Sequence, residues 1–527
     1  MSRSPLFARV SRALRMAQHC EQQSISTQQG FELAAQAQHS RRQFIGMAAA
    51  TVALTPLSVR AAAGGSGTRV AIVGGGLAGL TCADVLQRNG VIATLYDAST
   101  RLGGRCFSNR TLVPGMACEN GGELIDTGHK TMLAYANEFG LAREAIAHKV
   151  GEERFWFFGQ SWSEQQVVDE FRAVVAAMQP DLRAISGAAS FQSANDADRY
   201  FDGIDLATYL ASRCSGYPLV EAVLNEAYAA EYGLETWQQS TLNFLGFMRL
   251  NKQSKFEPFG VSDERFHLVN GNDGIVRGIE SRLQGTVARG ARLTRLGRDA
   301  SGVFLMYFNG SSVPERADVV VVAIPFSVLR GVQLDASLGL SADKRRAIST
   351  LGYGTNAKTM VAFNGRPWST QYAASGGTYS DLANHQNTWE SNRANATSKG
   401  IITDYASGDR GAALRTSRLQ PQVDAFLTDF NKLFPGIKSS AARQGNAYVA
   451  HLEHWPTNPL SLGSYTCYLP GQFTTVEGLT GEAAGLLKFA GEHADSFYSW
   501  QGYMEGGCLS GARAASEVLA DIKAGRV

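Results

Sequence analysis

The sequence predicts an α/β fold with two interleaved domains, and two observations carry that prediction. A buried strand, a glycine-rich turn, a helix and a second strand follow one another within residues 68–97, which is one complete βαβ unit. Apolar strand segments of the same kind return at 317–325 and after 486, separated by stretches of different pattern. We therefore expect a Rossmann-like domain interleaved with a mixed α+β domain, which a chain of 527 residues can accommodate.

The composition is that of a globular protein and excludes several functional classes. Hydrophobic residues make up 44% and charged residues 18% of the chain, which rules out wholesale disorder. Residues 1–63 hold seven Arg and two acids, so removing them changes the net charge of +2 by −5, to about −3. That balance argues against a nucleic-acid partner. The seven cysteines include no CxxC pair, so no metal site is expected.

The first element along the chain is an expected export signal. Residues 40–46 contain a twin-arginine pair, an apolar run reaches Val59, and three alanines end at Ala63. This order is typical of a twin-arginine signal peptide, predicted over 1–63, with the export machinery as partner and a periplasmic or secreted destination. The run is too short for a stable membrane span. The alternative is a disordered amino-terminal segment in which the Arg pair occurs by chance. Met16 is an alternative first residue of the chain.

The glycine-rich turn predicts a dinucleotide site. Gly74, Gly76 and Gly79 lie between a strand and a helix, the context that the motif requires. Gly74 permits the tight turn, Gly76 lets backbone N–H groups approach a pyrophosphate, and Gly79 allows close helix–sheet packing. Asp97, 18 residues beyond Gly79, is placed to accept hydrogen bonds from ribose hydroxyls. An acid there favours NAD or FAD, and both remain open at this point.

In the rest of the chain, apolar strand segments typical of a nucleotide-binding domain alternate with helical stretches and with strand-rich polar stretches. Gln165–Met178 and Ala207–Arg213 have helical periodicity, whereas 346–458 is strand-rich and polar. The expected divisions are a first nucleotide-binding part (67–125), a helical substrate-domain insertion (126–261), a second nucleotide-binding part (262–345), a substrate-domain sheet (346–458) and a third nucleotide-binding part (459–527).

The residues after the ribose acid identify a family resemblance. Two further glycines and two arginines follow directly, which suits a cofactor whose pyrophosphate and ribityl chain run deeper; they are Arg101, Gly103, Gly104 and Arg105. With this stretch the chain resembles the flavin-containing amine oxidase family, from about residue 68 to about residue 520. The resemblance implies FAD and the flavin amine oxidase fold.

Three further motifs match the family in order. Lys358 resembles the lysine that holds a water beside flavin N5, although an exposed strand lysine is the alternative. Glu492, in Phe489–His493, resembles the acid that helps to hold the ribityl–pyrophosphate part. Ser499–Gly506 is similar to the segment that caps the flavin ring, which makes Trp500 and Met504 candidate cofactor contacts.

The same resemblance implies an aromatic cage for the substrate amine. Tyr465 and Tyr503 would be two facing walls that exclude water and orient the nitrogen lone pair; ordinary core packing is the alternative. Covalent relatives carry a cysteine directly before the first cage tyrosine, and this chain has Ser464 there. We therefore expect FAD to be held without a covalent bond.

The resemblance implies the oxidative deamination of a primary amine or L-amino acid. A neutral amine would lose hydride to the flavin, the imine would be hydrolysed to a carbonyl and ammonia, and O2, the expected electron acceptor, would give H2O2. The segment 118–126 has no arginine for a substrate carboxylate, although one could come from 126–261. The Glu123 carboxylate could attract the cationic tail of a substrate. The alternative is a carboxylate that is solvated or bonded to backbone. His129 and His493 are interpreted as structural residues.

Two rival functions and the oligomeric state stay open. The first rival keeps the fold and passes electrons to an acceptor other than O2. The second is a non-catalytic flavin-binding partner protein, against which the combined presence of Lys358, Tyr465 and Tyr503 argues. A homodimer is neither required nor excluded by the sequence.

Overall fold

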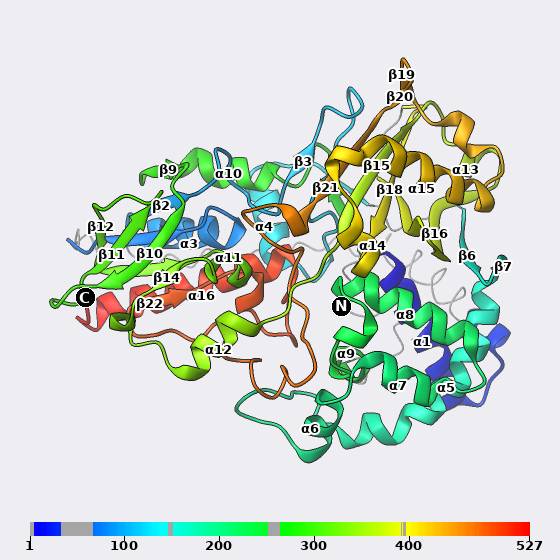
Figure 1. The fold of residues 1–527 in the computed structure, drawn as a ribbon, viewed down its shortest axis with the longest axis horizontal. Coiled ribbons are helices and arrows are strands. Elements are labelled where there is room, and N and C mark those ends of the chain that lie inside the picture. Colours follow the sequence, from blue (N-terminus) through cyan, green and yellow to red (C-terminus); the bar gives the residue numbers. More distant parts are fainter. Residues whose placement is uncertain (1–4, 33–66, 146–150, 251–263, 392, 394–396) are drawn as a thin grey trace, which may run out of the picture.

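The computed structural model describes residues 5–32, 67–145, 151–250, 264–391, 393 and 397–527. A parallel sheet with its helices lies at one end of the molecule, and a larger mixed sheet with a group of helices lies at the other (Figure 1). The functional residues expected from the sequence come from both parts.

The parallel sheet confirms the predicted α/β fold class. Its strands have the order β22-β13-β1-β2-β9, and every neighbouring pair is parallel. The strands come from three stretches far apart in the sequence, as expected for interleaved domains. They are β1 (Val70–Val73), β2 (Thr94–Asp97), β9 (Val287–Arg289), β13 (Val319–Val322) and β22 (Leu487–Phe489).

Two helices close one face of this sheet. α3 (Leu77–Arg88) directly follows the glycine-rich turn, and α16 (Met504–Lys523) packs along it. α4 (Lys130–Glu138) and α10 (Gly274–Arg282) pack against these helices. A separate four-stranded sheet of order β12-β11-β10-β14 lies in the same part of the chain: β10 (Leu293–Arg298), β11 (Phe304–Phe308), β12 (Glu315–Ala317) and β14 (Gln333–Leu334).

The second large sheet has seven strands in the order β21-β15-β18-β17-β16-β6-β7. Five of them come from the stretch predicted to be strand-rich: β15 (Ala357–Phe363), β16 (Ala374–Leu382), β17 (His385–Ser391), β18 (Gly400–Ala406) and β21 (Ala450–His454). In β15 every residue is buried, because α15 (Leu419–Leu433) packs near one face of the sheet and the loops of the nucleotide-binding part lie near the other.

The stretch 126–261 is not wholly helical, which corrects the sequence prediction. β6 (Glu152–Phe157) and β7 (Gln160–Trp162) extend the seven-stranded sheet, and β5 (Arg143–Ala145) pairs with β8 (Phe266–Leu268). The physical reason is that buried residues in β6 recur at every second position: Phe155 and Phe157 are 2% and 0% exposed. Alternate residues of a strand reach the same face of a sheet, so this spacing favours a strand over a helix.

The expected helices follow β7. α5 (Glu164–Ala184) contains the predicted helix 165–178 and begins with a reciprocal capping box between Ser163 and Gln166. α7 (Leu206–Arg213) matches the second predicted helix. Three more complete the group: α6 (Asp196–Asp202), α8 (Pro218–Tyr232) and α9 (Leu242–Leu250).

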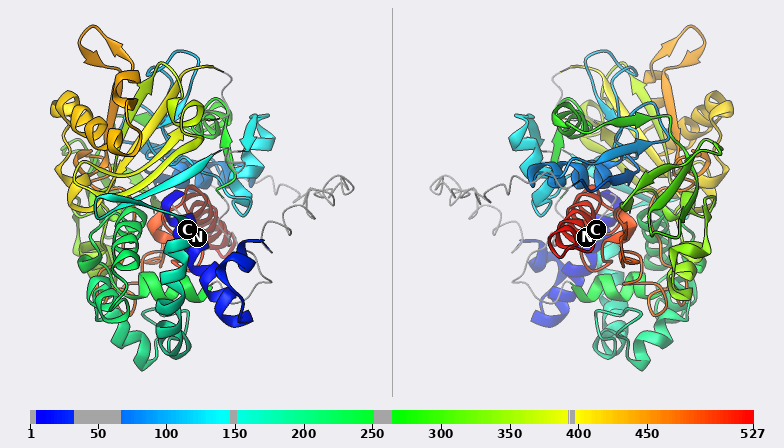
Figure 2. Two further views of the ribbon diagram at one scale, coloured as in Figure 1. Left: turned by 90° about the vertical axis from the view of Figure 1, so that its right-hand side faces the viewer. Right: turned by 90° about the vertical axis from the view of Figure 1, so that its left-hand side faces the viewer.

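A further helix, α1 (Pro5–Gln23), packs against α5 and α8 (Figures 1 and 2). It lies within the range predicted as signal peptide. The twin-arginine pair itself lies outside the described residues, so the signal assignment stays a prediction. Within the described ranges, no helix combines the length and apolar character needed to span a bilayer.

Candidate active site

A cavity of about 420 Å³ lies where the carboxyl ends of β1, β2 and β13 meet residues of the seven-stranded sheet. Ligands of open α/β sheets bind at this edge. Most predicted site residues line it: Gly74, Gly76, Asp97, Arg101, Gly103, Gly104, Arg105, Lys358, Tyr465, Glu492, Tyr503 and Met504. Gly79 and Trp500 are not among the lining residues.

The glycine-rich turn lets the start of α3 pack closely on the strand end on one side and leaves open space toward the cavity on the other. A Cβ on Gly79 would lie 1.8 Å from the carbonyl oxygen of Gly74, so the first turn of α3 packs directly on the strand end. A Cβ on Gly76 would meet no protein atom within 4 Å, because this residue, the N-cap of α3, faces the cavity. The helix N-terminus is therefore accessible to a phosphate, whose charge it would stabilise.

Asp97 is fixed at the end of β2, beside this turn. Its two carboxylate oxygens accept the backbone N–H groups of Gly75 at 2.6 Å and Ser99 at 2.7 Å. Burial raises the pKa of Asp97 above its usual value. The side chain lines the cavity at the place where the motif puts a ribose; that contact stays a prediction.

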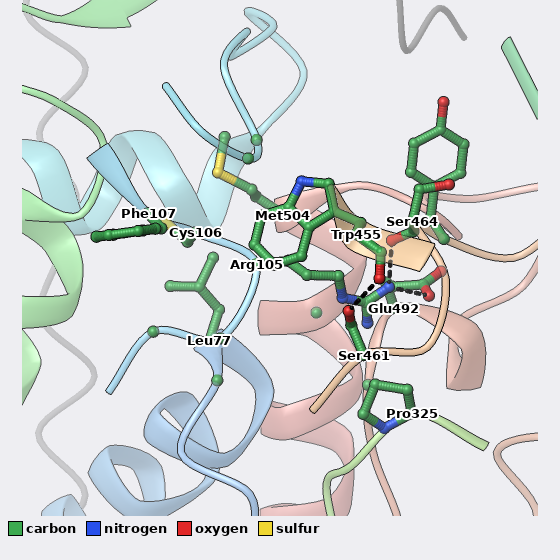
Figure 3. Close-up of a pocket in the computed structure, with 18 of the residues that line it drawn as sticks. Leu77, Arg105, Cys106, Phe107, Pro325, Trp455, Ser461, Ser464, Glu492 and Met504 are labelled. Atoms are coloured by element: carbon green, nitrogen blue, oxygen red, sulfur yellow. Dashed lines mark hydrogen bonds and ion pairs between the residues drawn. The ribbon is translucent and has the colours of Figure 1, made fainter. Parts of the chain in front are cut away.

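Two sequence-distant motifs meet through an ion pair. Arg105 donates from Nη1 to Glu492 Oε1 at 2.9 Å and to the carbonyl oxygen of Ser464 at 2.7 Å (Figure 3). Thr466 donates to the other oxygen of Glu492 at 3.0 Å. The first flavin motif, the second flavin motif and the cage segment are thereby joined at one point; their contacts with FAD stay predictions.

Arg101 lies at the same end of the cavity as Gly76 and Asp97, here called the cofactor end. Backbone carbonyl groups and an aromatic ring hold its side chain in place. It donates to the carbonyl oxygens of Leu102 and Gly104 at 3.3 and 2.9 Å, and its guanidinium lies 3.8 Å from the centre of the Phe107 ring. Burial lowers the pKa of Arg101. Together with the open space at Gly76 and the fixed carboxylate of Asp97, these groups fit a dinucleotide with a pyrophosphate.

Lys358 lies at the other end, on β15, with 7% of its side chain exposed. Its ammonium donates to the carbonyl oxygens of Glu119 at 3.2 Å and Gly121 at 2.8 Å, and to Glu123 Oε2 at 2.7 Å. An ammonium has three N–H groups, and all three are directed at protein acceptors. Lys358 therefore lines the cavity and is not the exposed strand lysine of the alternative, whereas its place beside flavin N5 and the water assigned to it stay predictions.

Glu123 is a partner that the sequence did not assign to Lys358. Its second oxygen accepts from Trp389 Nε1 at 2.9 Å and Ser391 Oγ at 3.0 Å. Burial acts to raise the pKa of Glu123, but the Lys358 ammonium outweighs it and lowers the pKa. The interpretation as a solvated or backbone-bonding carboxylate is wrong, because the side chain is 8% exposed and ion-paired.

Tyr465 and Tyr503 both line the cavity, in different surroundings. Tyr405 and Tyr465 share a hydroxyl–hydroxyl bond of 2.8 Å, and Tyr465 donates to the carbonyl oxygen of Ala230 at 3.2 Å. Tyr503 lies 5.5 Å, centre to centre, from the rings of Trp500 and of His129. That the two tyrosines face each other across a substrate stays a prediction.

Trp500 lies behind the lining. Its indole meets the His129 ring edge-on, at 4.5 Å and 82°, so its direct contact with FAD stays a prediction. Burial lowers the pKa of both His129 and His493 to about 3. Both are neutral near pH 7, which supports their interpretation as structural residues.

Lys358, Glu123 and Tyr465 mark the opposite end of the cavity, here called the reaction end. Sequence reasoning missed two aromatic residues there. Trp389 and Tyr405 line the cavity from β17 and β18, with ring centres 5.4 Å apart. Tyr405 pairs with Lys358 in the sheet register, and registered neighbours share a face. Alternation along each strand could have indicated the inward positions, but only the register shows which of them meet Lys358.

Comparison with known proteins identifies the family. Residues 77–519 match the family described as flavin containing amine oxidoreductase. The L-amino-acid oxidase of Pseudechis australis is 21% identical, covering 87% of this chain and 88% of its own. That of Vipera ammodytes ammodytes is 21% identical, with 85% and 92% covered.

Solved structures agree on the fold. Cyclohexylamine oxidase from Brevibacterium oxydans superposes with a TM-score of 0.73 at 17% identity, covering 86% of this chain and 99% of that one. Wild-type putrescine oxidase bound to putrescine gives 0.70 at 15% identity, with 86% and 99% covered. The chain therefore belongs to the flavin-containing amine oxidoreductase family, whose members are FAD-dependent enzymes acting on CH–NH2 groups.

Proposed function

We propose that this enzyme oxidises a primary amine that carries no α-carboxylate, with O2 as electron acceptor. The charge of the cavity carries the proposal. Four carboxylates line it, from Asp97, Glu123, Glu453 and Glu492, against three cationic side chains, from Arg101, Arg105 and Lys358. Within the described lining the surplus is negative, which attracts a protonated amine and repels an anion.

Each of the three cations already has partners. Arg105 is paired with Glu492 and Lys358 with Glu123. Arg101 bonds two backbone carbonyls at the cofactor end, away from the reaction end. Recognition of a substrate carboxylate requires a bidentate or equivalent cation, and the described lining offers none that is not engaged.

The residues of the reaction end have distinct roles in this proposal. Tyr465 and Tyr503 hold the amine and exclude water, so the nitrogen lone pair is oriented before reaction. Tyr405 fixes the hydroxyl of Tyr465. Lys358 and Glu123 form a neutral pair that keeps both side chains in one position. An amine that arrives protonated must lose its proton to water before oxidation, since the lowered pKa of Glu123 makes this carboxylate a weak base.

The residues around Gly76, Asp97, Arg105 and Glu492 would hold FAD, which would supply a hydride acceptor for the α-carbon of the amine and a route for two electrons and two protons to O2, giving H2O2. The imine then takes up water and releases ammonia and a carbonyl product. Aerobic turnover should consume one O2 for each H2O2 and each ammonia formed. If turnover requires an added acceptor and forms no H2O2, the dehydrogenase alternative is correct.

L-amino acids remain a second candidate, because the curated relatives described above are named L-amino-acid oxidase. This candidate requires a cation from outside the described lining. Matched pairs of an amine and its α-carboxylated counterpart separate the two candidates, since they differ in the carboxylate alone.

FAD is held without a covalent bond in this proposal. Ser464 occupies the attachment position and donates its hydroxyl to Asn356. Cys467 is fully buried and does not line the cavity. Acid precipitation should therefore release the yellow cofactor into the supernatant, and colour retained in the washed pellet would contradict the assignment.

Export by the twin-arginine route is a further part of the proposal. It rests on the sequence Ser40–Gly46. Replacing both Arg41 and Arg42 by Lys should leave folded, yellow protein in the cytoplasm. Periplasmic delivery that is undiminished by the double substitution would exclude this route.

A further inference from the structure

The segment that precedes the twin-arginine pair is built into the substrate part of the fold. Over residues 13–21 and 23, the part of α1 whose side chains are described, one face is buried, and the helix packs against α5 and α8. Exposure is 2% or less at each of its described core positions: Ala13, Leu14, Met16, Ala17 and Cys20. The spacing of three and four residues is that of an amphipathic helix with its apolar stripe turned to a core.

The turn after α1 closes the contact with polar groups. Arg172 of α5 forms an ion pair with Glu21 at 2.7 Å and donates to Thr27 Oγ1 at 3.1 Å. Thr27 in turn donates to Asp169. Thr27 is 3% exposed, so this bond is made in the interior and not at a solvated rim.

Residues 26–32 also fold back tightly on α1. A Cβ on Gly30 would lie 2.6 Å from Cys20 Sγ and 2.8 Å from Met16 Sδ. The chain therefore returns so close to the helix that a larger residue at Gly30 would displace the side chains of Cys20 and Met16. Apolar packing, an ion pair and a close turn together make residues 5–32 one unit, here called the leader helix unit.

The leader helix unit supports one wall of the cavity. It packs on α8, and the carbonyl oxygen of Ala230 in α8 accepts the hydroxyl of Tyr465. Removing it would expose the apolar faces of α5 and α8 that it now covers, and contiguous apolar surface of that kind is not left uncovered in soluble proteins.

We propose that the leader helix unit stays with the folded enzyme even where the chain is cut between it and the first strand. A signal peptide removed after Ala63 would carry away Met1–Ala63, including a helix of the core. Any cleavage in the twin-arginine segment then yields two chains that remain associated through α5 and α8, with residues 5–32 as the smaller partner. This inference does not depend on the substrate or on the electron acceptor.

A site-specific protease sequence inserted between Gly64 and Gly65 of the full chain tests the proposal. After cutting, the amino-terminal fragment should elute with the larger fragment at a 1:1 ratio in size-exclusion chromatography without denaturant, and separate from it in denaturant. Intact-mass analysis of the peak reads the ratio directly. A fragment that elutes alone, while the larger fragment stays folded and yellow, would overturn the proposal.

Two variants of α1 show whether the buried face makes the contact. Ala17→Asp places a charge at a position with 0% exposure, whereas Gln23→Asp places it at an exposed position of the same helix. Ala17→Asp should release the fragment after cutting, or yield no folded protein before cutting, while Gln23→Asp should retain the fragment as the unmodified chain does. Equal retention in both variants would contradict docking through this face.

Enzyme purified from the producing cells gives an independent reading. Its intact mass should account for residues 5–32, either within one chain or as a bound fragment. Active, folded enzyme from which these residues are absent would refute the inference.

Discussion

The two ends of the cavity are constructed differently. The cofactor end centres on one continuous stretch, Gly74 to Arg105, with backbone and glycines at its surface, and Glu492 joins this stretch from a distant motif. The reaction end is assembled from side chains of several distant segments, and its central contact joins Glu123 to Lys358 across 235 residues. The first depends mainly on local chain geometry, and the second depends on the register of the seven-stranded sheet and on the packing of the loop that carries Glu123.

This difference predicts different failures. A change at the cofactor end should alter whether FAD is bound, because the surface there is rigid backbone. A change at the reaction end should leave FAD bound and alter how fast an amine reduces it, because those side chains position the substrate. Four substitution or pH experiments examine the comparison.

The largest effect is expected at the glycine-rich turn. Gly79→Ala should abolish the yellow holoenzyme, because the added methyl group would overlap the carbonyl oxygen of Gly74 at 1.8 Å. Gly76→Ala meets no protein atom within 4 Å, so the chain should fold and lose FAD affinity only. Soluble yield, circular dichroism and the absorbance ratio of flavin to protein distinguish the two.

Gly331→Ala is the matched control, since its added Cβ would lie at an ordinary 3.5 Å from the nearest atom. Normal FAD content in Gly76→Ala would show that the open space at this residue does not receive the cofactor.

The next largest effect is expected on breaking the buried ion pair. Lys358→Met leaves Glu123 charged and unpaired, and Glu123→Gln does the same to Lys358; each should cost about 3–5 kcal/mol of the free energy of unfolding. Peroxide formation should slow by ~10–1000-fold, the range expected when one positioned polar group is lost. The double variant should be less destabilised than the two single losses added together.

Lys488→Met is the control, because Lys488 forms an equally buried ion pair with Asp521 and is not among the lining residues of the cavity; it should lower stability and leave both half-reactions unchanged. Stopped-flow measurement of flavin reduction and reoxidation separates the steps. We expect reoxidation in Lys358→Met to suffer at least as much as amine oxidation. Wild-type rates in both half-reactions would remove Lys358 from the reaction end.

A smaller effect is expected at the paired tyrosines. Tyr465→Ala or Tyr503→Ala should weaken flavin reduction because orientation and desolvation are lost. Tyr405→Phe removes only the hydroxyl bonded to Tyr465, so reduction should slow roughly fivefold, the loss of about 1 kcal/mol. Tyr372→Phe, whose hydroxyl bonds Pro435 in the outer part of the sheet domain, should have no effect on reduction; equal slowing in both would assign the loss to general stability.

The smallest effect on turnover near neutral pH comes from a pH dependence, which should affect the reaction end first. Burial opposes protonation of His267, but the hydrogen bonds that its ring donates to Glu119 and Glu144 outweigh it and raise its pKa to about 10. Because the folded value exceeds the unfolded value of about 6.5, this stabilisation is complete below pH 6.5 and is lost as pH rises through 10.

Thermal unfolding measures this dependence. The unfolding temperature should fall between pH 7 and pH 10, and His267→Gln should show a shallower fall. Glu119 also accepts a hydrogen bond from Lys358 through its carbonyl oxygen, so amine turnover should decline before FAD is released. Identical pH profiles for the two proteins would contradict the assignment.

The contrast also explains how much could be predicted from the sequence. Gly74, Gly76, Gly79 and Asp97 could be given individual roles because strand, turn and helix follow one another without interruption. Lys358 and Tyr465 could be placed by resemblance alone. Their partners could not be placed: Tyr405 meets Lys358 through sheet register, which one sequence does not display, and Glu123 meets it through the packing of a loop on the sheet.

The helix α1 was missed for a different reason. Its apolar stripe is ordinary amphipathic sequence. Because a twin-arginine pair follows it, residues 1–63 were all interpreted as a signal peptide. A targeting pattern describes how a segment is recognised during export, and it does not determine how the residues before it pack in the folded protein.

Anaerobic reduction of the holoenzyme by matched substrates tests the central claim most directly. The unmodified enzyme is mixed with 2-phenylethylamine or with L-phenylalanine, and with further pairs of this kind, and the loss of oxidised-flavin absorbance is followed. A cavity with a surplus of carboxylates and no unengaged cation in its described lining predicts that at least one amine reduces the flavin about 100-fold or more faster than its amino acid. If amino acids reduce the flavin and their amines do not, the account of the reaction end is contradicted.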